Sequence, residues 1–186
     1  MSVQTSSQVN GVDLDLLVQT VGAIKERPDL AQFEFRSNTR WLGGGRCETQ
    51  IGGFYGAGSE DTTRTKPFVL QGDEPPVLLG DNTGPNAVEA ILHALSSCLS
   101  VGVAYNAAAQ GIEIDELTFE ARGTLDLHGF LGLADDVRPG YSRVKIDCRV
   151  KSNASKEQID SLLNYVMRTS PVLDIIRNPV EVEVSY

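Results

Sequence analysis

A long apolar run between Gly80 and Gly111 constrains the fold of this 186-residue chain more than any other feature. The run reads GDNTGPNAVEAILHALSSCLSVGVAYNAAAQG, so turn residues come first and a segment long enough for about seven helical turns follows. Asn86 and Glu89 have the spacing of a capping box, and Gly111 can take the positive φ that ends a helix. Large apolar residues point in most directions around this predicted helix, which favours a core helix over a surface helix.

Cys98 lies in the middle of the predicted helix, among alanine, serine and glycine residues. Such small side chains let another backbone approach closely. A cysteine in this setting is either a small buried hydrophobic residue or a reactive thiol. Helical periodicity does not distinguish these two interpretations.

Charge and cysteine content narrow the class of protein. The net charge is −9 and the sequence has no basic cluster, which argues against a nucleic-acid partner. Three irregularly spaced cysteines do not form a secreted disulfide framework, and the polar residues 1–11 lack the apolar core of a signal peptide. The apolar character of the long helix is interrupted by polar residues, namely Glu89, His93, Asn106 and several serines. We therefore expect the helix in a protein core and not in a membrane. We therefore expect a cytoplasmic protein.

The order of the predicted elements indicates an α+β fold. No Walker loop, GxGxxG motif or zinc-type cluster is present, so no cofactor and no metal ion are expected. Helices are expected at 13–27, 86–111, 155–169 and, as a short segment, 170–178. Strands are expected at 32–38, 46–51, 67–71, 114–127, 141–151 and 180–184, with a loop at 52–65.

Two stretches carry a resemblance to a known family. Glu89, Ala94, Leu95 and Cys98 in the run EAILHALSSC, and the later run SPVLDIIRNPVEVEV, resemble the OsmC/Ohr family of thiol-dependent organic hydroperoxide reductases. The resemblance covers roughly residues 33–184. It implies an OsmC-like fold in which wrapped β-sheets surround two long central helices of an intertwined homodimer. On this basis we expect an OsmC-like domain at 32–186, after an N-terminal extension at 1–31 that carries an amphipathic helix.

The resemblance also implies the reacting residues. Cys98 matches the cysteine that attacks the peroxide, Arg46 in GGGR matches an arginine that serves the thiolate, and Glu89 matches a carboxylate that orients the arginine. Arg40 competes with Arg46 for that role. Glu89 is nine residues before Cys98 and therefore lies on nearly the opposite side of the helix, so a capping role for Glu89 is the alternative.

Ser170 marks the clearest departure from the family pattern. The family usually has a resolving cysteine in a Cys-Pro step, and this chain has Ser170-Pro171. Serine cannot form a disulfide, although it is a good helix N-cap before a proline. Cys47 is an alternative resolving thiol, and Cys148 is expected to pack in the core. His93 cannot reach Cys98 along the helix, and His128 lies at a strand end, so a cysteine hydrolase is disfavoured.

These observations leave three functional interpretations. The preferred one is a peroxidase that reduces small organic hydroperoxides through a Cys98 sulfenic acid, which an external thiol then reduces. The second is a non-catalytic OsmC-like protein that binds a hydrophobic ligand at the dimer interface. The third is a structural or interaction protein in which Cys98 is inert.

Overall fold

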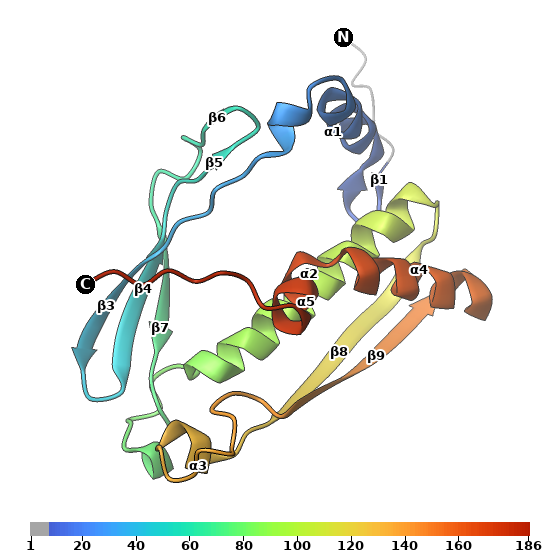
Figure 1. Ribbon diagram of the computed structural model, residues 1–186. Helices are drawn as coiled ribbons and strands as arrows, with labels where there is room; N and C mark the ends of the chain where they lie inside the picture. The colour runs from blue at the N-terminus through green and yellow to red at the C-terminus, as the bar shows by residue number, and fades with distance from the viewer. Residues whose placement is uncertain (1–7) are drawn as a thin grey trace. The chain divides into compact units, whose positions relative to one another are not determined.

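The computed structural model describes residues 8–186 and has the α+β architecture expected from the sequence (Figure 1). The chain forms two compact units, one comprising residues up to Leu14 together with Ile91–Tyr186, and the other comprising Asp15–Ala90. Each unit is described by itself. Predictions that concern residues 1–7 lie outside the described residues.

The core of the first unit forms where three helices meet a β-hairpin. The helices are α2 (Ala87–Ala109), α4 (Lys156–Thr169) and α5 (Pro171–Arg177), and the hairpin consists of β8 (Ile114–Thr124) and β9 (Arg143–Ser152). The buried core side chains come from the helices and the turn after α2: Leu95, Leu99, Val103, Ala107, Ile112, Leu162, Val166 and Leu173. Apolar residues of both strands pack against them, so the hairpin forms one wall of this core.

The long helix α2 begins as predicted but buries only one face. Asn86 Oδ1 accepts the Glu89 N–H at 2.9 Å, and Glu89 Oε2 accepts the Asn86 N–H at 2.9 Å, which is the predicted capping box. Gly111, with φ 68°, ends the helix region. Ile91, Val101 and Tyr105 are 42%, 51% and 51% exposed, so the expectation of burial on every side is wrong for the single chain.

Close packing at Gly102 explains part of the small-residue content of α2. A Cβ atom at Gly102 would lie 2.8 Å from Val166 Cγ1 of α4. The polar side chains of α2 are satisfied locally, because Ser100 Oγ donates to the Ser96 carbonyl and Asn106 Nδ2 donates to the Gly102 carbonyl. By length and composition alone α2 could also span a membrane. Its buried face contributes Leu95, Leu99, Val103 and Ala107 to the core cluster.

The β8–β9 hairpin is antiparallel and has one apolar and one charged face. Phe119 pairs with Cys148 and Ala121 pairs with Ile146 in its register. The opposite face is exposed to solvent and carries ion pairs such as Arg149–Glu120 at 3.3 Å. Strand β8 ends three residues earlier than predicted. The chain then turns into the short helix α3 (Leu127–Phe130), where the Asp126 side chain accepts the His128 N–H.

Residues 8–13 of this unit form a small hairpin. Strands β1 (Gln8–Val9) and β2 (Val12–Asp13) pair across a turn. In that turn, Asn10 Nδ2 donates to the Ile112 carbonyl at 2.9 Å and Asn10 Oδ1 accepts the Ile114 N–H at 2.9 Å. One asparagine side chain thus satisfies two backbone groups of the α2–β8 connection and ties the hairpin to it.

Helix α5 begins at its predicted cap, Ser170, whereas the predicted last strand does not form. Ser155 and Gln158 make a capping box at α4, and Ser170 caps α5 with Pro171 in its first turn. The structure has no strand within residues 178–186, and Val180, Val182 and Val184 are 52%, 76% and 80% exposed. Alternation gives such a segment an apolar face, but a strand also needs a partner for its backbone groups, which the single chain does not supply.

The second unit is built around a three-stranded antiparallel sheet in the order β3–β4–β7. Its strands are β3 (Asn38–Gly43), β4 (Arg46–Ile51) and β7 (Phe68–Gly72). The unit also contains α1 (Leu14–Glu26), the short hairpin β5 (Tyr55–Gly56) and β6 (Ser59–Glu60), and two 3-10 turns, η1 (Pro28–Ala31) and η2 (Pro76–Leu78). The predicted helix and the predicted strands at 46–51 and 67–71 are thus confirmed to within a residue or two.

An aromatic cluster replaces the strand that was predicted at 32–38. In that range only Glu34 makes an isolated bridge, to Tyr55, and β3 begins at Asn38. Phe33, Phe35 and Phe54 stack with ring centroids 5.4–6.1 Å apart. Alternating phenylalanines therefore place their rings on one another here and not on the face of a sheet. The predicted loop at 52–65 contains the β5–β6 hairpin.

Candidate functional site

Cys98 meets Ser170 inside the first unit. Cys98 lies on α2 and is half-buried, and its Sγ atom is 3.2 Å from Ser170 Oγ. Ser170 is 5% exposed and stands between α4 and α5. The fold therefore brings together Cys98 of the run EAILHALSSC and Ser170 of the run SPVLDIIRNPVEVEV, although they are 72 residues apart in the sequence.

The cap geometry of α5 determines what the Ser170 hydroxyl can do. Ser170 Oγ accepts the backbone N–H of Leu173 at 3.3 Å, and Pro171 presets the first turn of the helix. Because a hydroxyl has a single proton and this contact uses a lone pair, the proton remains available to the Cys98 sulfur. A hydroxyl that can donate to a thiolate therefore stands beside a half-buried cysteine.

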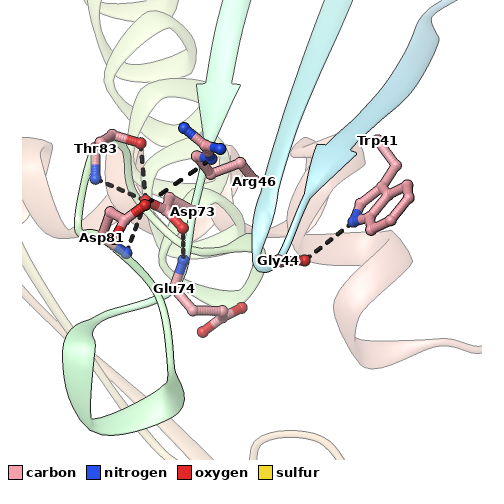
Figure 2. A network of polar contacts seen from close by, with 7 residues as sticks. All are labelled: Trp41, Gly44, Arg46, Asp73, Glu74, Asp81 and Thr83. Carbon is pink, nitrogen blue, oxygen red and sulfur yellow. Dashed lines mark hydrogen bonds and ion pairs between the residues drawn. The ribbon is translucent and has the colours of Figure 1, made fainter.

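Arg46 lies in the second unit, at the start of β4, and faces a carboxylate that the sequence analysis did not single out. Its Nε atom is 4.0 Å from Asp81 Oδ2, and the two side chains are 50% and 73% exposed (Figure 2). Such an exposed pair contributes little stability, so Arg46 keeps its charge available for other contacts. Trp41 Nε1 donates to the Gly44 carbonyl at 3.0 Å and fixes the neighbouring hairpin turn (Figure 2).

Asp73 organises the loop that presents Asp81. Its carboxylate is 2% exposed and accepts the backbone N–H groups of Glu74, Asp81 and Thr83 as well as the Thr83 hydroxyl, at 2.8–3.2 Å (Figure 2). These donors, chiefly the Thr83 N–H, hold the pKa of Asp73 below its ordinary value although burial acts in the opposite direction. Gly80 lets the loop pass close to the Glu74 carbonyl, where a Cβ atom would not fit.

The other two candidates from the sequence have mainly structural partners. Glu89 caps the first turn of α2, which is the alternative role that the sequence left open for it. Arg40 lies opposite Glu48 in the β3–β4 register, and the Arg40 Nη2 to Glu48 Oε1 distance is 3.8 Å. Both contacts are within the second unit, as are those of Arg46.

The remaining cysteines and histidines show no nucleophile–base pair with Cys98. Cys148 packs on the apolar face of β9, and burial raises the pKa of its thiol. Cys47 is half-buried on β4. His93 contacts Ser97 at 3.5 Å, and His128 pairs with Asp126 at 2.6 Å. All three cysteines are free thiols.

Turn chemistry was the signal that could have found Asp73 and Asp81. Both acids stand in a stretch rich in proline, glycine, asparagine and threonine, in which short acids accept backbone N–H groups a few residues away. The Cys98–Ser170 contact agrees with the family resemblance, which puts Ser170 in the place of the resolving cysteine, whereas no local pattern in the sequence indicates it.

Comparisons with known proteins agree with this architecture. A family model described as "OsmC-like protein" matches residues 80–185. No curated protein matches the sequence.

Among solved structures, an OsmC-like protein from Mycoplasma pneumoniae is similar with a TM-score of 0.58 and 15% identity, over 78% of this chain and 89% of the other. An organic hydroperoxide resistance protein OsmC from Legionella pneumophila gives 0.55 and 15%, over 82% and 96% of the two chains. An organic hydroperoxide resistance protein from Elizabethkingia anophelis gives 0.55 and 13%, over 81% and 93%. At this identity the likeness shows the fold.

Proposed function

Because the chain belongs to the OsmC-like protein family, whose model matches residues 80–185, we propose that it is a thiol-dependent peroxidase that reduces small organic hydroperoxides through Cys98. The observation that carries this proposal is the 3.2 Å contact between Cys98 Sγ and Ser170 Oγ. It places a hydrogen-bond donor against the thiol of the helix motif. The names of the Legionella and Elizabethkingia proteins, which refer to organic hydroperoxide resistance, support the substrate class.

The first step oxidises Cys98 and reduces the hydroperoxide. The Cys98 thiolate attacks the terminal oxygen of ROOH, an S–O bond forms, the O–O bond breaks, and the leaving alkoxide takes up a proton to become ROH. Cys98 is left as a sulfenic acid. The Ser170 hydroxyl donates a hydrogen bond to the thiolate before the attack and so stabilises the reactive form.

An external thiol completes the cycle, because Ser170 cannot resolve the sulfenic acid. One RSH condenses with Cys98–SOH to give a mixed disulfide and water. A second RSH attacks that disulfide, regenerates the Cys98 thiol and leaves as RSSR. Two external thiols thus supply the two electrons that the hydroperoxide consumed.

An arginine belongs to the proposal as the group that attracts the peroxide and the thiolate. Both arginines have a carboxylate at a similar distance, 4.0 Å for Arg46–Asp81 and 3.8 Å for Arg40–Glu48. We prefer Arg46 because the side chain of Asp81 is 73% exposed, whereas that of Glu48 is 22% exposed and less free to move with its arginine. Asp81 takes over the orienting role that the sequence analysis gave to Glu89, which is engaged as a helix cap. An arginine beside a thiol favours the thiolate form.

The proposal includes a homodimer in a cytoplasmic setting. The apolar side chains of Val101 and Tyr105 on α2, and the alternating valines at 180–184, are exposed in the single chain. A second copy would cover the helix and give the valine segment a strand to pair with. Light scattering at micromolar concentration should give twice the chain mass of 20.1 kDa, and a well-folded monomer would refute the dimer.

A turnover assay tests the catalytic proposal. Cumene hydroperoxide should be consumed in the presence of a monothiol or a dithiol, faster than hydrogen peroxide under the same conditions, and Cys98→Ser should abolish the turnover. Cys148→Ser is the matched control, because it removes a free thiol from the same unit without touching Ser170, and it should retain activity. Turnover that survives Cys98→Ser would refute the assignment.

A second candidate function is favoured by Ser170 itself. Because Ser170 stands where the family usually has its resolving cysteine, the two-cysteine cycle cannot run in this chain. This favours a non-catalytic protein that binds a hydrophobic ligand at the dimer interface. That function predicts no hydroperoxide consumption with any thiol reductant, even though the wild type is folded and its Cys98 is accessible to alkylation.

A further inference from the structure

The first unit has a partly open cavity whose lining does not include Cys98. It has a volume of about 610 Å³ and lies between the helices α2, α4 and α5 on one side and β9 with residues 138–143 on the other. This volume is within the range of small-molecule sites, about 300–1,000 Å³. Its walls are mainly apolar and include Leu95, Leu99, Phe119, Ile146, Leu163 and Val166.

Three arginines also line this cavity, namely Arg138, Arg143 and Arg177, and no acidic residue does. Within residues 8–186, none of the three makes an ion pair or a side-chain hydrogen bond. By contrast, Arg122 and Arg149 on the same hairpin pair with Glu120 or Asp147. In a chain with a net charge of −9, three arginines without acidic partners at one cavity are a local excess of positive charge.

We propose that this cavity binds a single-chain amphiphile with an anionic head group, of which a medium-chain fatty acid is the simplest example. The alkyl chain would lie against the apolar walls, where burial of methylene groups is favourable. The head group would contact the arginines, whose planar guanidinium groups match a carboxylate with paired hydrogen bonds. This binding site is separate from Cys98 and does not depend on the proposed peroxidase activity.

Cys148 gives a readout within the cavity wall. It lines the cavity, and its thiol is half-buried. At alkaline pH, saturating dodecanoate should slow the alkylation of Cys148 by iodoacetamide at least tenfold. Cys47, which belongs to the other unit, serves as the internal control and should react at an unchanged rate. Equal Cys148 rates with and without dodecanoate would overturn the proposal, including the case in which a second copy of the chain already fills the cavity.

Direct binding to the full chain tests the chemistry of the ligand. Titration calorimetry should show dodecanoate binding more tightly than octanoate, by up to about fourfold for each added methylene. Dodecan-1-ol and dodecyltrimethylammonium, which lack the anionic head, should bind at least tenfold more weakly than dodecanoate. Equal affinity for the alcohol and the carboxylate would overturn the role of the arginines.

Substitution of the arginines provides the matched comparison. The triple variant R138Q/R143Q/R177Q should bind dodecanoate at least tenfold more weakly than the wild type. The control R122Q/R149Q removes arginine charge from the same hairpin outside the cavity and should stay within about twofold. Equal losses in both variants would show a general charge effect and refute the site. If the triple variant does not fold, Cys148 protection in the wild type still decides the question.

Discussion

Replacement of Ser170 by cysteine should convert the Cys98–Ser170 contact into a disulfide. The Cys98 Sγ and Ser170 Oγ atoms are 3.2 Å apart, and a disulfide needs a sulfur–sulfur distance of about 2.05 Å, so the side chains must approach by only about 1 Å. In Ser170→Cys, one equivalent of cumene hydroperoxide should oxidise Cys98 to the sulfenic acid. The new thiol then attacks it and releases water.

The magnitude follows from the length of chain that the bond closes. The two positions are 72 residues apart, and the chain-entropy model gives about 4 kcal/mol of stabilisation for a loop of that length. For a domain of this size each kcal/mol moves Tm by about 2–4 °C, so the oxidised variant should melt roughly 8–16 °C above its reduced form. The reduced variant should lose up to about 1 kcal/mol relative to the wild type, because a thiol is a weaker cap for the Leu173 N–H.

Peptide mapping under non-reducing conditions and calorimetry of both forms provide the assay. Thr169→Cys is the matched control, since it adds a thiol one residue away at an exposed position whose hydroxyl contacts the Tyr165 carbonyl. It should give neither the disulfide nor the rise in Tm. A folded Ser170→Cys variant whose Cys98 oxidises without forming the bond would refute the placement of Ser170 beside the reactive thiol.

Three further predictions concern stability. Leu162→Ala should lower the free energy of unfolding in urea by about 2–5 kcal/mol, because Leu162 is 1% exposed in the core cluster, and a loss below 1 kcal/mol would contradict that packing. Glu89→Ala should cost about 0.3–1.5 kcal/mol through the lost bond to the Asn86 N–H, yet leave the Cys98 alkylation rate unchanged, and a slower rate would argue for a role in the site. The pKa of Asp73 is lowered chiefly by the Thr83 N–H, so its stabilising effect is present above about pH 4 and is lost as the pH falls through that lowered pKa. Asp73→Asn should therefore be less stable than the wild type at pH 7, and its free energy of unfolding should depend less on pH below pH 4. If urea titrations give the two proteins the same change in unfolding free energy below pH 4, the prediction is contradicted.

Local signals in the sequence predicted the elements that depend on neighbouring residues. The capping box of Asn86 and Glu89, the cap at Ser170 and the strand at 141–151 all follow from short-range chemistry, and the structure confirms them. The family that the runs EAILHALSSC and SPVLDIIRNPVEVEV resemble is confirmed by the match over residues 80–185. The domain boundary at residue 32, the dimer and the catalytic roles of Cys98 and Arg46 stay predictions.

Predictions failed where a distant partner decides the structure. The valine segment at 180–184 alternates like a strand, but a strand forms only where another backbone pairs with it. Phe33 and Phe35 also alternate, yet their rings stack with Phe54 and the segment forms a single bridge. In the same way, the side-chain bonds of Asn10 join it to residues about a hundred positions away, which no local pattern could indicate.

The most direct test of the peroxidase proposal is the chemical state of Cys98 in the wild-type protein after one equivalent of cumene hydroperoxide. The protein should be trapped with dimedone and examined by peptide mass spectrometry. We expect a dimedone adduct on Cys98 and none on Cys148. When an external thiol is added before dimedone, the Cys98 adduct should not form. A Cys98 that remains a free thiol in the folded protein after treatment with the hydroperoxide would contradict the peroxidase proposal.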